Sequence, residues 1–372
     1  MSRLLSVSKF GVVKTGVDGM KLKKWLEELY RPAGTIEDKR DYFIDNLKAF
    51  LIVLVIFGHI VLYWGSVEQM TALYYFVHTF HMPFFVFVTG YMAKGVMKNG
   101  KFAAHRLFSM LWMYLVFSIL SVLVARAFGR DARLNLFDVS AAQWYLLAVA
   151  IWYLLVPLLL SLKPWVGMLL TVAAGLLIGY FDNVDTYLTL SRVFTFMPFF
   201  AFGLYLSKEK MEAFLDKKLW VRGIALLVLV LACGYFVFVG NPLYGYSRIV
   251  FGGKPYREIL KEYRAYGFLI RGGLYAFAVI ISAACMLVMP RRKMFFSYVG
   301  KYSMAVYVLH ILVRNGLNYA GVFDLTKQLS APYMLLTIPV SVVAALLLGN
   351  PLFGKAFNFI SNPIKFLKKK QD

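Results

Sequence analysis

Ten apolar stretches, each long enough to cross the hydrocarbon core of a bilayer, recur along this chain of 372 residues. They lie near residues 47–64, 73–93, 107–128, 144–161, 165–181, 190–206, 219–239, 268–289, 302–320 and 333–353. Backbone polar groups in lipid must be satisfied within the protein, so long apolar stretches form helices there. Hydrophobic residues make up 60% of the chain and its mean hydropathy is +0.66, more than one soluble core needs. We therefore predict an all-α polytopic membrane bundle of about ten transmembrane helices.

The distribution of basic residues predicts how this bundle is oriented. With the N-terminus placed inside, 28 of the 41 Lys and Arg residues lie in or beside the inner connections, against 11 for the outer ones. Under the positive-inside rule this bias predicts that both termini are cytoplasmic. The net charge of +22 has the same origin, because clusters such as 291–293 and 368–370 flank apolar stretches, where anionic lipids attract them. Membrane lipids, and not nucleic acid, are the partners expected for this charge.

The expected organisation has three parts. A basic cytoplasmic tail spans 1–40, a membrane domain spans 41–355, and a second basic cytoplasmic tail spans 356–372. Within the first tail, residues 20–31 could form a short amphipathic helix on the inner leaflet; a flexible tail is the alternative. The sequence contains no Walker A loop, dinucleotide glycine fingerprint or HExxH motif, so neither ATP nor NAD is implied.

Two ionisable residues, Lys48 and His59, lie inside the first apolar stretch. A helix turns by 100° and rises about 1.5 Å per residue, so this spacing places them within about 20° of one face and about 16 Å apart. Ionisable groups in a bilayer are costly and by default mark a functional site. For Lys48 the alternatives are snorkelling to lipid phosphate and pairing with Asp45, a residue that we expect to cap the helix start.

Further motifs give the chain a resemblance to a known family. Lys48, ten intervening residues and His59 are followed by FHMPFF at 80–85 and Gly-Tyr at 90–91. This combination resembles the integral-membrane acyltransferase family 3, and is most similar to its fucose 4-O-acetylase-like branch. QWYL at 143–146, the aromatic stretch at 191–203 and GKYS at 300–303 extend the resemblance over most of residues 41–315.

The resemblance implies transfer of an acyl group, most often acetyl from acetyl-CoA, to a hydroxyl of a cell-envelope sugar or polysaccharide in a bacterial cytoplasmic membrane. A hydroxyl that attacks a thioester needs a base, and neutral imidazole suits that task at physiological pH. We assign His59 as this general base or as a transient covalent acyl acceptor, and the sequence leaves both roles open. Lys48, near the cytoplasmic end of its helix, is placed to meet the anionic donor or the thioester oxygen.

The donor site of the family also includes an Arg-x-x-Arg pair at the start of the third span, which binds CoA phosphates. This chain has Arg106 in the first place but Ser109 in the second. The resemblance therefore transfers only Arg106 as a donor-binding residue. The alternative for Arg106 is a positive-inside residue with no contact to the donor.

Four residues are candidates for binding the acceptor: His81, Trp144, Arg192 and Arg271. His81 lies at a depth similar to that of His59, and the two arginines hold matching outer places in their stretches. Trp144 is more often an interfacial anchor, and the arginines could instead snorkel. The connection at about 240–267 interleaves tyrosines with Arg and Lys, which suits either a glycan or an interfacial loop.

Three alternatives complete the expectations. His78 and His81 could share a helix face, but a third ligand is not evident, so no metal site is expected. His310 is expected to be a hydrogen-bonded core histidine. The alternative function is a transporter or flippase of a lipid-linked sugar, which would predict inverted repeats and paired broken helices that the sequence does not show.

Overall fold

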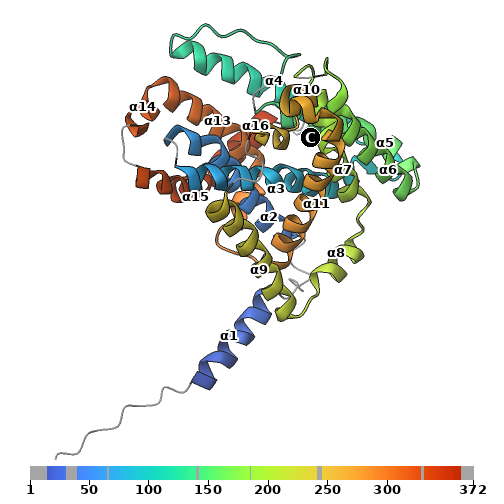
Figure 1. The fold of residues 1–372 in the computed structure, drawn as a ribbon, viewed down its shortest axis with the longest axis vertical. Helices are drawn as coiled ribbons and strands as arrows, with labels where there is room; N and C mark the ends of the chain where they lie inside the picture. The colour runs from blue at the N-terminus through green and yellow to red at the C-terminus, as the bar shows by residue number, and fades with distance from the viewer. Residues whose placement is uncertain are drawn as a thin grey trace, which may run out of the picture.

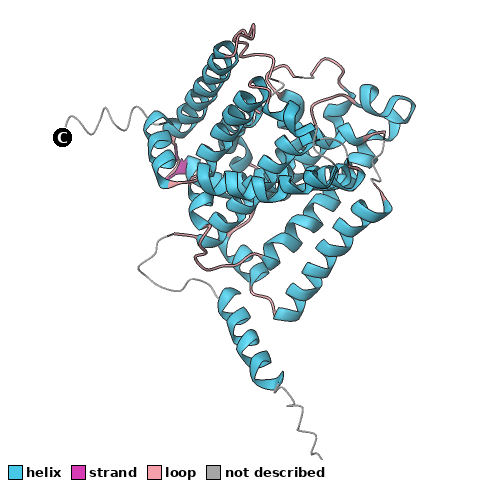
Figure 2. Cartoon of the chain, turned by 90° about the vertical axis from the view of Figure 1, so that its left-hand side faces the viewer, coloured by secondary structure: helices cyan, strands magenta, loops and turns pink. Residues whose placement is uncertain are grey.

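The computed structural model describes residues 15–30, 40–64, 67–139, 142–184, 186–240, 245–327 and 331–361. Regular structure in these residues is almost entirely helical (Figure 2). The one hairpin among them pairs β1 (Met97–Lys98) with β2 (Lys101–Phe102) in a short turn between two long helices. The fold is all-α, as the apolar stretches predict.

Helices occupy all ten of the apolar stretches. They are α2 (Tyr42–Ile60), α3 (Glu68–Met92), α4 (Ala104–Ala127), α5 (Trp144–Ser161), α6 (Pro164–Leu177), α7 (Leu190–Tyr205), α9 (Leu219–Gly234), α11 (Gly267–Val288), α13 (Ser303–Tyr319) and α15 (Thr337–Leu348). Shorter elements connect them: η1 (Val61–Trp64), η2 (Ala93–Val96), η3 (Ile178–Tyr180), α8 (Lys208–Leu215), η4 (Tyr235–Val239), η5 (Ser247–Phe251), α10 (Tyr256–Leu260), η6 (Lys261–Tyr266), α12 (Ser297–Lys301), α14 (Val322–Lys327), η7 (Ala331–Leu336) and α16 (Pro351–Ser361).

Fewer of the described helices meet the length and hydropathy needed to cross a membrane than there are apolar stretches. Within the described residues, six helices are long and apolar enough to cross a membrane. The count rises to eight if α7 with α8 and α15 with α16 each form one span, bent by 93° and 61°. The helix α6 has 14 residues, about 21 Å, which falls short of a hydrocarbon core of about 30 Å. The polytopic fold is confirmed, whereas the count of ten is not, because hydropathy does not show where a helix stops or bends.

The N-terminal helix α1 (Thr15–Tyr30) extends from one end of the bundle (Figures 1 and 2). Its last turn is attached to the bundle, since the Tyr30 hydroxyl donates to the carbonyl of Val288 at 3.1 Å. Leu22 and Trp25 remain 57% and 48% exposed, although the Arg292 guanidinium lies 6.0 Å from the Trp25 ring centroid. Contact of this helix with the inner leaflet stays a prediction. Residues 1–14 and 362–372 of the two expected tails lie outside the described residues.

The start of α2 corrects one expectation. Asp41, not Asp45, caps the helix: its carboxylate accepts a hydrogen bond from the amide of Ile44 at 3.2 Å. The helix begins before the apolar run does, so Asp45 falls within its first turn. There the Asp45 carboxylate forms ion pairs with Arg40 and with Lys48, the latter at 3.1 Å.

The centre of the bundle is the pair of helices α3 and α7, which pack along one another (Figure 1). In α3, 72% of the most apolar window is buried, compared with 17% in the peripheral α9. Two glycines permit the close approach. A Cβ added at Gly90 would overlap the carbonyl oxygen of Phe200, and one added at Gly203 would overlap the carbonyl oxygen of Phe87.

We predict that Gly203→Ala destabilises the protein by about 1–3 kcal/mol, because the added methyl group forces two helix backbones apart. Gly223→Ala is the matched control: Gly223 also lies in a helix, but nothing lies within 4 Å of its Cβ position. The control should be neutral or slightly stabilising. Thermal unfolding in lipid nanodiscs measures both, and equal midpoints for the two variants would contradict the packing described.

Candidate active site

Several helices enclose a cavity of about 300 Å³, which we call the histidine cavity. It lies near the end of α2 and the starts of α3, α5 and α7, at the opposite end of α2 from Lys48. Described residues of five helices and of η5 line it, together with Ala142 just before α5. They are Val55, Gly58 and His59 (α2); Tyr74, His78, His81 and Met82 (α3); Trp144 (α5); Arg192 and Phe196 (α7); Val250 and Phe251 (η5); and Tyr307 and Arg314 (α13).

His59 lies in the last turn of α2, partly exposed to this cavity, and its ring centroid is 5.3 Å from that of His310. His310 is 3% exposed, and its Nδ1 is 2.9 Å from the carbonyl oxygen of Val306. A carbonyl only accepts, so Nδ1 must carry the proton, which leaves the Nε2 of the neutral ring with a lone pair. That Nε2 is buried and has no hydrogen-bond partner among the described residues. His310 is thus a buried hydrogen-bonded histidine, as expected, but with one nitrogen unused beside His59.

His78 and His81 are held in the same way on α3. The Nδ1 of His78 donates to the carbonyl of Tyr74 at 2.7 Å, and the Nδ1 of His81 donates to the carbonyl of Val77 at 2.8 Å. The two ring centroids are 4.6 Å apart. In the part of the chain that the structure describes, no group of three or more His, Cys, Asp or Glu residues is arranged to hold a metal ion.

Arg192 and Trp144 meet at the cavity from two different helices. The Arg192 guanidinium lies over the Trp144 ring, 5.4 Å from its centroid, and its Nε donates to the carbonyl of Phe251 at 3.3 Å. Trp144 also stacks on Phe196, with centroids 5.5 Å apart. Three of the four predicted acceptor-side residues, His81, Trp144 and Arg192, therefore line one cavity with His59.

The fourth, Arg271, lies elsewhere. Its side chain is buried in α11, 1% exposed, where Nη1 donates to the carbonyl of Gly175 at 2.9 Å. The guanidinium packs over the Tyr256 ring at 4.4 Å from the centroid. Arg271 does not line the histidine cavity, and its contacts in the structure are those of a residue that joins α11 to α6 and α10.

The predicted donor-side residues also lie outside this cavity. Lys48 is paired with Asp45 and lies about 16 Å from His59 along the continuous helix α2. Arg106 lies at the exposed start of α4, and its guanidinium covers Gly95. The hydroxyl of Ser109, the residue that replaces a second arginine, donates to the carbonyl of Ser361 at 3.1 Å. The structure thus separates donor-side and acceptor-side candidates and does not bring Lys48 and His59 together.

The sequence interpretation missed three polar cavity residues: Tyr74, Tyr307 and Arg314. Tyr307 and Arg314 share one face of α13 with His310, and Tyr74 shares a face of α3 with His78 and His81. Both sets are spaced by three and four residues, the spacing that aligns side chains on a helix. This spacing of polar residues within apolar stretches could have identified them.

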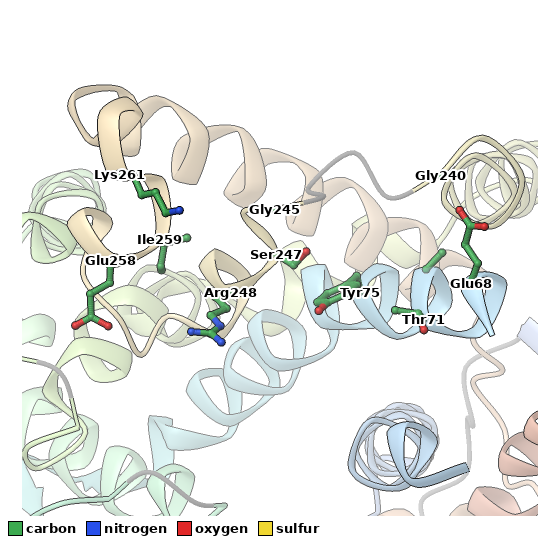
Figure 3. Close-up of a pocket in the computed structure, with 11 residues that line it drawn as sticks. Glu68, Thr71, Tyr75, Gly240, Gly245, Ser247, Arg248, Glu258, Ile259 and Lys261 are labelled. Atoms are coloured by element: carbon green, nitrogen blue, oxygen red, sulfur yellow. The ribbon is translucent and has the colours of Figure 1, made fainter. Parts of the chain in front are cut away.

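A second, larger cavity of about 940 Å³ lies beside α3, and we call it the outer cavity (Figure 3). Glu68, Thr71 and Tyr75 follow one another along α3, and residues of the predicted 240–267 connection complete the lining. This cavity carries both signs of charge, from two glutamates and two basic residues: Glu68, Glu258, Arg248 and Lys261.

Known proteins resemble this chain in sequence. The profile of a family described as an acyltransferase domain matches residues 41–350. The chain belongs to this membrane acyltransferase family. Two relatives are nodulation proteins NolL, from Mesorhizobium japonicum, 25% identical over 238 residues, and from Sinorhizobium fredii, 26% identical over 233 residues. The matches cover 59% and 57% of this chain and 61% of each relative, so the chain spans less than two thirds of their length. No solved structure matches significantly.

We predict that the effect of Gly58→Ala depends on His78. A Cβ at Gly58 would lie 2.8 Å from Cε1 of His78, whose ring is held by Tyr74, so the substitution should lower the thermal midpoint. In a His78→Ala background the same change should be neutral or stabilising, because the obstructing ring is gone. A double-mutant cycle of thermal midpoints measures this coupling, and additive effects would contradict the geometry.

Proposed function

We propose that this protein transfers an acyl group, most often acetyl, from acyl-CoA to a hydroxyl of a cell-envelope sugar or polysaccharide. Membership of the acyltransferase family supports the reaction class, and a bacterial cytoplasmic membrane is the proposed location. The observation that carries the proposal is the position of His59: a partly exposed imidazole in a cavity that two more histidines, two tyrosines, one tryptophan and two arginines also line.

Two chemical routes use this imidazole. As a general base, His59 takes the proton of the acceptor hydroxyl while the oxygen attacks the thioester carbon; the new C–O bond replaces the C–S bond, and the CoA thiolate receives the proton. As a nucleophile, an imidazole nitrogen attacks the thioester first and releases CoA, and the acceptor hydroxyl then displaces the imidazole from the acyl group. We propose that the unused Nε2 of His310 helps to orient the His59 ring in either route.

The donor enters, in this proposal, from the inner side. The cytoplasmic end of α2 carries Lys48, and the start of α4 carries Arg106 with an exposed side chain. A lysine ammonium is a compact charge suited to phosphate, and Asp45 holds it in place. Ser109 is uncharged, so in this proposal the chain binds the CoA phosphates with one arginine, Arg106, where the family pattern has two.

The acceptor enters, in this proposal, from the outer side. Trp144 and Arg192 line the histidine cavity, and the outer cavity adds Tyr75 and the mixed charges described above. Aromatic faces pack against sugar rings, and charged side chains bind hydroxyls at the ring edge. The two cavities lie on either side of η5, which contributes Arg248 to the outer cavity and Phe251 to the histidine cavity.

We predict that His59→Ala lowers acetyl transfer from labelled acetyl-CoA by about 10²–10⁴-fold, since the base or nucleophile is lost. The measurement uses purified protein in lipid vesicles with envelope glycan as acceptor. His105→Ala is the matched control, because His105 is exposed at the start of α4 and outside the histidine cavity. Undiminished turnover in His59→Ala would end the assignment.

The same assay separates the two routes. Without acceptor, the acyl-histidine route leaves label on the protein that hydroxylamine removes and that His59→Ala does not acquire. The general-base route leaves none. Replacement of the two free cysteines, Cys233 and Cys285, by Ala excludes thioester label as its source.

We predict that Lys48→Gln raises the KM for acetyl-CoA by about 10-fold to 100-fold, the loss of one charged hydrogen bond to the donor, about 1.5–3 kcal/mol. Asp45→Asn is the comparison: it removes the carboxylate that holds Lys48 but keeps the ammonium, so its KM should rise less than that of Lys48→Gln. Initial rates at varied acetyl-CoA measure both. An unchanged KM in Lys48→Gln would show that Lys48 does not bind the donor and that its role is the ion pair with Asp45.

A further inference from the structure

The histidine cavity contains positive charge without negative charge. Arg192 and Arg314 line it together with three histidines, and none of its described lining residues is Asp or Glu. The outer cavity nearby is different, because Glu68 and Glu258 accompany its basic residues. The lack of acidic residues is thus a property of the histidine cavity and not of this end of the molecule.

Arg314 is the less compensated of the two arginines. Its Nη1 donates to the hydroxyl of Tyr63 at 3.2 Å, and its guanidinium lies over the Tyr63 ring, 5.7 Å from the centroid. Its Nε is buried and has no hydrogen-bond partner, and no described carboxylate forms an ion pair with it. The Tyr63 hydroxyl and ring satisfy some of the hydrogen-bonding groups of the guanidinium but do not neutralise its charge. In a low-dielectric environment such a charge strongly favours the binding of an anion.

Arg192 approaches the cavity from a different helix. Backbone carbonyls of Phe251 and Val139 accept hydrogen bonds from it at 3.3 and 3.4 Å, and Trp144 lies under its guanidinium. These contacts fix the orientation of the guanidinium in advance of binding. Planar guanidinium groups match carboxylate and phosphate oxygens in geometry as well as charge. Both arginines and His59 line this one cavity of about 300 Å³.

We propose that the histidine cavity binds an acceptor that carries a carboxylate or a phosphate, held by Arg314 and Arg192 beside His59. This inference rests on the proposed function, and it narrows the acceptor from any hydroxyl compound to an anionic one. The bound anion completes the charge balance of the cavity and anchors the molecule, so that its hydroxyl can face His59. A neutral sugar lacks this anchor and binds more weakly. The phosphates of CoA share the same chemistry, and the experiment separates the two sources.

The test measures equilibrium binding to the full chain in nanodiscs by calorimetry, without any transfer. The probes are methyl β-D-glucuronide and methyl β-D-glucoside, which differ only at C6, a carboxylate in the first and a hydroxymethyl group in the second, together with inorganic phosphate. We expect the glucuronide to bind at least about tenfold tighter than the glucoside. Arg314→Gln should abolish this difference and phosphate binding while leaving the affinity for the glucoside unchanged, and Arg314→Lys should retain part of the preference.

Arg130→Gln is the matched control, because Arg130 is exposed outside the cavity and the substitution changes the net charge equally. Arg130→Gln should keep the full preference for the glucuronide. If Arg130→Gln loses this preference, the effect comes from long-range charge and not from contact with Arg314. Equal binding of the two sugars, or no Arg314-dependent binding of either glucuronide or phosphate, would overturn the proposal. Thermal midpoints confirm that each variant is folded.

CoA identifies the source of the anion. If the acceptor supplies it, CoA and the glucuronide bind together and Arg314→Gln leaves the Kd for CoA unchanged. Competition between them, with CoA weakened equally by Arg314→Gln, would reassign the site to the donor and overturn the proposal. Loss of acetyl transfer in His59→Ala combined with failure of these binding tests would leave the acyltransferase proposal standing and remove only this inference.

Discussion

The candidate site depends on the close contact between α3 and α7. At Gly90 and Gly203 the backbone of each helix approaches a carbonyl of the other so closely that no side chain fits between them. Because α3 carries His78 and His81 and α7 carries Arg192, the spacing of these helices sets the width of the histidine cavity. A membrane protein gains little from burying apolar surface against other helices, so such backbone contact is a principal source of fixed geometry.

The remaining walls follow from this pair. The C-terminal end of α2 brings His59 to one side, and α13 brings Tyr307 and Arg314, with His310 packed against His59. The imidazoles of His78, His81 and His310 each donate Nδ1–H to the carbonyl one turn earlier, which leaves the lone pair on Nε2. The helices therefore set the tautomers as well as the positions, and the cavity presents lone pairs and guanidinium groups with no carboxylate among its described lining residues.

Much of this arrangement could be predicted from the sequence, and the failures have physical causes. The apolar stretches predicted an all-α membrane fold, and the motifs around His59, His81, Trp144 and Arg192 predicted residues that do share a cavity. Arg271 occupies a similar place in its stretch but is covered by Tyr256 from a distant connection, and local sequence does not reveal such a contact. Asp41 caps α2 because the helix starts before the apolar run, and the short or bent helices were counted as full spans because hydropathy has no information on helix ends.

The continuity of α2 restricts how the two sides of the membrane can be connected. Its inner end is fastened by Asn46, whose side chain donates to the carbonyls of Pro290 and Arg292, and by the contact between Asp45 and Gly300. His59 is on the same unbroken helix, about 16 Å along its axis from Lys48. If the proposed donor binds near Lys48, its acyl group has to cover about 16 Å to reach His59, so the donor would have to be long and slender. The length of the donor's flexible arm, and not a motion of the base, would then determine which carriers can serve.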